Sequence, residues 1–78
     1  QMAPLLSPEM SMDKVQEVMA LVEALLGGGR SGVLLSEIIE RSRASQAEVT
    51  SAFDRLEAAG GYTVQDVDKR DRLLLRSA

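Results

Sequence analysis

The chain has 78 residues, with nine Lys and Arg against twelve Asp and Glu, and it contains neither cysteine nor histidine. A chain of this length buries only roughly 60% of the surface that its unfolded form exposes, so one small core is the most that it can build. Without cysteine and histidine it lacks disulfides, the usual zinc ligands, thiol nucleophiles and imidazole bases, and we expect neither an enzyme nor a metal or cofactor site.

The charge is unevenly distributed along the sequence. Residues 1–29 hold four acidic side chains and one lysine, whereas residues 30–78 hold eight basic and eight acidic ones. Proteins that bind nucleic-acid backbones usually gather Lys and Arg on one face, and the composition shows no such excess. No apolar run approaches the roughly 20 residues that cross a bilayer, and no signal-peptide pattern is present. We therefore expect an intracellular protein with no membrane contact and no small-molecule substrate.

The first predicted element is an amphipathic helix, preceded by a tail over residues 1–10. It has two possible starts, either Ser7, which is followed by a proline, or Ser11 one turn later. In both cases apolar residues recur at the spacing of one helical face: Val15, Val18, Met19, Val22, Leu25 and Leu26. The opposite side is acidic. The stretch Gly27–Gly32 ends the helix and is predicted to be a connector, because it lacks the Gly-Lys-Ser/Thr ending of a phosphate-binding loop.

Two further helices are predicted after this connector. Residues 33–35 indicate a very short strand, and a helix is expected from Ser36 to Arg41 or Ser42. The next helix has the clearer start, because Ser45 followed by Glu48 matches the capping box. Its apolar face then recurs at intervals of three and four: Val49, Ala52, Phe53 and Leu56. Gly60 is expected to end this helix in a left-handed conformation.

The last part of the chain changes to the period of a β-strand. Residues 62–67 alternate, with Tyr62 and Val64 on one side of the strand. Residues 72–77 form the second strand, with Leu74 on the face opposite to its two leucine neighbours. The polar stretch from residue 68 to residue 71 has the length of a hairpin turn. The sequence therefore predicts a C-terminal β-hairpin.

This order of elements resembles the winged helix-turn-helix superfamily. The resemblance covers about Ser11 to Arg76 and is carried by "LLSEIIERSRASQAEVTSAFDRLEAAGGYTVQDVDKRDRLLLR". Within it, "DKRDR" is similar to the charged wing tip of MarR-type regulators. The expected fold class is therefore α+β, a winged helix with a three-helix helix-turn-helix core and a C-terminal β-hairpin wing, in one domain over residues 11–78. These motifs indicate architecture more than function, because one fold serves many functions.

The resemblance also implies a candidate binding surface. In the DNA-binding members the third helix enters the major groove and the wing contacts the backbone. By position, the corresponding residues here are Arg41, Arg43, Gln46, Thr50, Asp54, Arg55, Lys69, Arg70 and Arg72. Glutamine and arginine are able to read base edges, but Glu48, Asp54 and Glu57 on the same helix would repel phosphates.

Each basic cluster also has a simpler interpretation. The wing arginines alternate with aspartates, as in an ordinary solvated turn, and Arg41 and Arg43 are placed to pair with Glu37 or Glu40. The chain is similar in outline to the protein-docking winged helices of replication protein A, MCM helicases and ESCRT-II subunits. Its acidic first helix suits a basic amphipathic partner helix.

The sequence therefore predicts a non-catalytic docking module that binds a protein partner. We expect it to act in a DNA replication, repair or transcription assembly, in the nucleus or nucleoid. Direct binding of duplex DNA through the third helix and the wing is the alternative. Self-association through the first helix is a third possibility.

Overall fold

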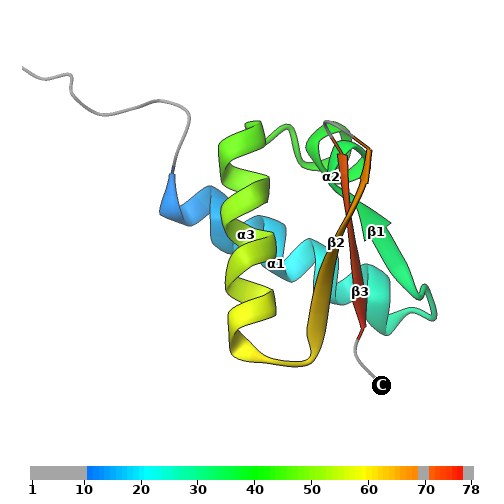
Figure 1. Ribbon diagram of the computed structural model, residues 1–78. Coiled ribbons are helices and arrows are strands. Elements are labelled where there is room, and N and C mark those ends of the chain that lie inside the picture. Colours follow the sequence, from blue (N-terminus) through cyan, green and yellow to red (C-terminus); the bar gives the residue numbers. More distant parts are fainter. Residues whose placement is uncertain (1–10, 69–70, 77–78) are drawn as a thin grey trace, which may run out of the picture.

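A computed structural model of the protein describes residues 11–68 and 71–76, so the predicted tail over residues 1–10 lies outside the described residues. The elements follow one another as α1 (Met12–Gly27), β1 (Gly32–Leu34), α2 (Leu35–Ser42), α3 (Gln46–Ala59), β2 (Tyr62–Asp68) and β3 (Asp71–Arg76). The three helices pack together, and the β2–β3 hairpin lies to one side of them (Figure 1). The fold is α+β and has the layout of a winged helix, as predicted.

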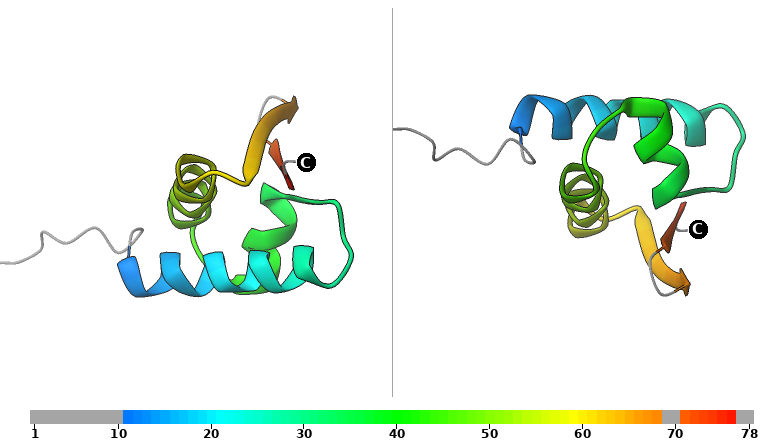
Figure 2. Two further views of the ribbon diagram at one scale, coloured as in Figure 1. Left: turned by 90° about the horizontal axis from the view of Figure 1, so that it is seen from below. Right: turned by 90° about the horizontal axis from the view of Figure 1, so that it is seen from above.

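The short strand β1 completes a sheet. All three strands are antiparallel, and their order is β1-β3-β2. Leu74 in the central strand lies opposite Val33 of β1 and Val64 of β2. Because side chains alternate across a strand, Leu74 and Val33 share the face that turns toward the helices, and both are buried. Figure 2 shows α1 and α2 beside each other, with the hairpin beyond α2 and α3.

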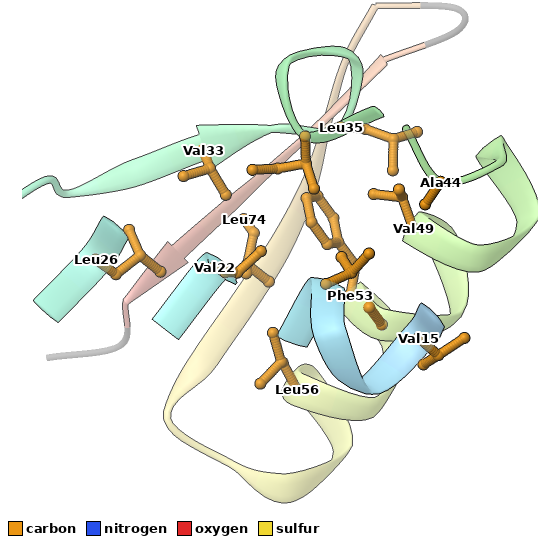
Figure 3. Packing of buried hydrophobic residues seen from close by; sticks show 13 residues of the cluster. Val15, Val22, Leu26, Val33, Leu35, Ala44, Val49, Phe53, Leu56 and Leu74 are labelled. Carbon is orange, nitrogen blue, oxygen red and sulfur yellow. The ribbon is translucent and has the colours of Figure 1, made fainter. Parts of the chain in front are cut away.

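The core contains the predicted apolar faces of the helices and one residue from each of two strands. Phe53 of α3 is fully buried and is the largest of these side chains, and Figure 3 shows its ring among residues from α1, α2 and β3. The buried apolar residues are Val15, Val18, Val22, Leu26, Val33, Leu35, Ile38, Ala44, Val49, Ala52, Phe53, Leu56 and Leu74. Met19, Leu25, Ile39, Tyr62 and Val64 pack against this cluster but are only partly buried. The periodicity therefore identified the buried faces of α1 and α3, whereas the burial of Val33, Leu35 and Ala44 was not predicted.

The helix starts follow the predicted caps in two cases out of three. Of the two possible starts of α1, the structure has Ser11, whose hydroxyl accepts from the amide of Lys14. The capping box of α3 is present as predicted. The predicted start of α2 at Ser36 was wrong, because Leu34 is the N-cap and makes no side-chain cap. Leu34 is held in an extended conformation by its strand pairing, so the helix begins directly after β1.

The hairpin differs from the prediction at its turn. The second strand begins at Asp71 rather than Arg72, because Asp71 already pairs with Asp68 across the hairpin. The residues that join the strands, Lys69 and Arg70, lie outside the described residues. At the other end of β2, Gly60 has a φ of 88° and Gly61 a φ of 97°, so both occupy the positive-φ region that only glycine adopts readily. Gly60 thus ends α3 at the expected position, but its ψ of 154° lies outside the left-handed helical conformation that we predicted.

Candidate functional site

The outer face of α3 is the candidate surface, and the capping box at its start sets the orientation of the helix. The Ser45 hydroxyl accepts from the amide of Glu48 at 3.1 Å, and the Glu48 carboxylate accepts from the amide of Ser45 at 2.9 Å. The second carboxylate oxygen of Glu48 accepts from the amide of Ser11 at 2.7 Å. One side chain therefore joins the first residues of α3 to the N-cap of α1.

Glu48 was wrongly assigned to the outer face on the basis of sequence. The residue is only 5% exposed and lies with the core residues of α3. The hydrogen bond from the Ser45 amide outweighs the effect of burial and, with the bond from Ser11, holds the pKa of Glu48 below its ordinary value. A capping box in the sequence indicates the first bond, but the bond to Ser11 connects residues 37 positions apart and has no sequence signal.

The exposed side of α3 is small and acidic at its centre. Asp54 is exposed, and so are Ala47 and Ala58, which lie seven positions before and four after it on the same side of the helix. Of the remaining candidates, Gln46 is exposed and Thr50 is partly exposed. The outer face therefore offers short side chains around a single carboxylate.

Two longer side chains of α3 turn away from this centre. Arg55 reaches the start of α1, where its Nη2 lies 3.7 Å from Sδ of the exposed Met12. Glu57 turns to the other flank, where its Oε2 accepts from the amide of Val64 in β2 at 3.4 Å. The structure thus places Arg55 against α1, apart from the surface on which sequence reasoning had put it.

The arginines of α2 and the preceding connector form an ion-pair network. Arg30 makes two hydrogen bonds to the Glu37 carboxylate, at 2.6 and 2.8 Å, and Nε of Arg41 makes a third at 3.1 Å. Arg41 is thereby paired, as one of the two interpretations predicted. Arg43 has a left-handed φ of 62° at the end of α2, and it is exposed without an ion pair to any described residue. Among the basic candidates that the structure describes, it is the one most available to a partner.

The base of the wing is held by acidic side chains. Nε of Arg72 lies 3.4 Å from a carboxylate oxygen of Asp66, whose side chain is 81% exposed. Asp71 accepts from both the amide and the hydroxyl of Ser36, at 3.1 and 2.8 Å, and so joins β3 to the first turn of α2. Burial raises the pKa of Asp71, but the bonds from Ser36 and from the Arg72 amide outweigh it and leave this pKa below its ordinary value. The Asp71 bond was not foreseen from the sequence.

No protein-family model, curated protein or solved structure gives a significant match to the chain. Within residues 11–68 and 71–76, no helix is long and apolar enough to cross a bilayer. The same residues contain no cluster of three or more His, Cys, Asp or Glu that could hold a metal ion. The function of the candidate surface on α3 is therefore inferred from its geometry and charge.

The Glu37 network predicts how stability depends on pH. The hydrogen bonds from Arg30 lower the pKa of Glu37 to about 2, from an ordinary value of 4.5. A carboxylate whose pKa is depressed by folding stabilises the folded state above the unfolded pKa, and this stabilisation is lost as the pH falls toward the folded pKa. We expect Glu37→Gln to lower the free energy of unfolding at pH 7, and this deficit to shrink between about pH 4.5 and 2.

Urea unfolding of both proteins across this pH range, followed by circular dichroism, measures the deficit. Glu40→Gln is the matched control, because Glu40 is exposed on the same helix and makes no ion pair to a described residue. A deficit for Glu37→Gln that stays constant from pH 7 to pH 2 would contradict the assignment of the effect to this carboxylate.

Proposed function

We propose that the protein is a non-catalytic docking module of the winged-helix type, which binds a basic segment of a partner protein through the outer face of α3. The assembly that we propose for it is one of DNA replication, repair or transcription, in the nucleus or nucleoid. The observation that carries this proposal is the outer face of α3 itself, where Asp54 lies between the small residues Ala47 and Ala58.

Small side chains favour this interpretation on geometric grounds. A partner helix packs closest where the facing side chains are short, since interhelical distance is set by the residues at the contact. A carboxylate in the middle of that contact then selects for a basic partner side chain, and opposite charges across an interface steer association and suppress wrong partners. The outer side of α1 adds to the acidic surface, because Asp13, Glu17 and Glu23 are all exposed.

The same features oppose binding of DNA. Duplex DNA presents one negative charge per roughly 1.7 Å, and proteins gain affinity for it by neutralising phosphates with Lys and Arg. Here Asp54 would face the groove, while Arg55 is turned toward α1 and Arg41 is paired with Glu37. DNA binding remains the alternative because Arg43 is exposed without an ion pair to any described residue, and the sequence between β2 and β3 contains Lys69 and Arg70.

An NMR titration of the labelled chain distinguishes the two functions. We expect a random-sequence duplex to bind more weakly than about 10⁻⁴ M near physiological salt, which is the weak limit for non-specific binding. A basic amphipathic helical peptide should instead shift the amide resonances of α3 and of the acidic side of α1. Micromolar duplex binding that falls steeply with added salt would contradict the docking proposal.

Charge reversal provides the matched variants. Asp54→Lys should weaken peptide binding at least tenfold, because it places a like charge at the centre of the contact. Glu40→Lys changes the net charge equally on an exposed position of α2 and should leave the affinity within about twofold. Equal losses for both variants would show a general charge effect and no docking at α3.

A further inference from the structure

The strand β2 has an edge with which no other described strand pairs. In the order β1-β3-β2, β3 is central and β2 is paired on one side only. β2 has seven residues, whereas the opposite edge strand β1 has three. Edge strands expose unpaired amide and carbonyl groups, which form a template for another strand. The longer edge of this sheet is thus available for pairing.

The direction of the backbone groups along β2 follows from two contacts. The Arg76 amide donates to the Ser31 carbonyl at 3.3 Å, so it points toward β1 and away from its register partner Tyr62. The amide of Val64 points away from β3, because it donates to Glu57. Hydrogen-bonded and non-hydrogen-bonded pairs alternate along an antiparallel ladder. Tyr62, Val64 and Asp66 therefore direct their backbone groups outward.

Glu57 is the one described side chain that occupies this edge. Its 3.4 Å contact with the Val64 amide is longer than the usual 2.7–3.2 Å of an N–H···O bond, and both groups are exposed. An incoming strand would therefore displace a weak bond. The released carboxylate would remain beside the newly added strand, ready to pair with a cation on it.

The charges along the edge decide which strand fits. Val64 and Asp66 lie on the same face of β2, since they are two residues apart, and Glu57 approaches from α3 on that face. Pairing of β2 with the β2 of a second copy, in the register that places Val64 opposite Val64, would bring the two Glu57 carboxylates together, and like charges across paired strands are destabilising. A strand with Lys or Arg at alternate positions would instead place one cation against Glu57 and the next beside Asp66, whose exposed carboxylate also lies 3.4 Å from Nε of Arg72.

We infer that the free edge of β2 binds an extended basic segment of the partner protein by strand addition, with Glu57 exchanging its bond to the Val64 amide for an ion pair with the incoming strand. The backbone hydrogen bonds would supply affinity, and the alternating cations would supply specificity, as in other cases of β-augmentation. This inference rests on the proposed docking function, and it names the backbone conformation that the partner adopts at β2.

The test uses the full labelled chain and a capped peptide in which lysine alternates with threonine. We expect the largest amide shifts at Val64 and Asp66, together with slower hydrogen exchange there. The same peptide carrying N-methyl groups on alternate residues cannot complete the backbone ladder and should lose at least tenfold in affinity. Glu57→Gln should weaken binding at least threefold, whereas Glu40→Gln, an equal charge change at an exposed position of α2, should leave it within twofold.

Each alternative outcome has a defined meaning. Binding of the N-methylated and unmodified peptides with equal affinity would overturn strand addition. If only a basic helical peptide binds, and it shifts α1 and α3 but not β2, the docking function stands and this inference is wrong. If neither peptide binds, both fail. A dimer in sedimentation equilibrium that Glu57→Gln strengthens would identify a second copy of the chain as the occupant of the edge and would overturn the inference.

Discussion

Replacing Phe53 by alanine is expected to lower the free energy of unfolding by about 3–5 kcal/mol, the usual cost of removing a buried aromatic side chain. Phe53 is fully buried and has the largest side chain of the core. Domains of ordinary stability unfold with only about 5–15 kcal/mol, and a chain of 78 residues has a small core. Phe53→Ala should therefore leave a substantial unfolded fraction at 37 °C.

Urea denaturation followed by far-ultraviolet circular dichroism measures this loss. Phe53→Leu keeps most of the apolar volume and should cost less than half as much. Asp54→Ala, at the adjacent but exposed position of α3, should change stability by no more than about 0.5 kcal/mol. A loss below about 1 kcal/mol for Phe53→Ala would contradict the central position of this ring.

Removing the Glu48 carboxylate should have the second largest effect on stability. Glu48→Ala removes the carboxylate that accepts from the amides of Ser45 and Ser11, and both of these hydrogen bonds are partly buried, so losing them is costly. The substitution acts on two helices at once, because Ser11 is the N-cap of α1 and Ser45 is that of α3. We expect the Tm to fall by several degrees and the first turn of α1 to fray.

Thermal unfolding by circular dichroism reports the change in Tm, and hydrogen exchange of the first amides of α1 reports the fraying. Glu48→Gln keeps one carbonyl oxygen and therefore one of the two bonds, so its Tm should lie between those of the wild type and Glu48→Ala. The depressed pKa of Glu48 adds a second readout. The wild type should lose this contribution as the pH falls below the ordinary range of a glutamate, so its advantage over Glu48→Ala should shrink in acid. An unchanged Tm for Glu48→Ala at neutral pH would show that the link between the two helices is not stabilising.

The proposed docking surface and the proposed strand addition depend on different carboxylates of α3. Glu57 lies between the outer face of α3 and the free edge of β2, where its carboxylate contacts the Val64 amide. Asp54 lies at the centre of the outer face and Glu57 beside the edge, so variants at these two positions separate the two surfaces. Variants of these two carboxylates therefore distinguish failure of the docking proposal from failure of strand addition.

Sequence alone determined the order of the elements and the apolar faces of the first and third helices. Apolar residues at intervals of three and four, and the alternation in residues 62–67, follow from the periods of a helix and a strand. The cap at Ser45 was also readable, and Ser11 was one of two candidate caps for the first helix, because such a side chain bonds an amide three residues away. These features can be predicted from the sequence because each depends on residues within about one helical turn of one another.

Only the tertiary structure decided which charges remain on the surface. Glu48 and Glu57 were both counted from the sequence as carboxylates that a DNA duplex would meet, but Glu48 is buried and bonded to the Ser11 amide, and Glu57 contacts the Val64 amide at the edge of β2. The orientation of Arg55 toward Met12 likewise depends on how α1 crosses α3. Helical periodicity assigns a side chain to a face, but the partner of a long charged side chain is set by elements that are distant in the sequence. The candidate surface therefore depended on the packing of the helices and the sheet, which no local pattern encodes.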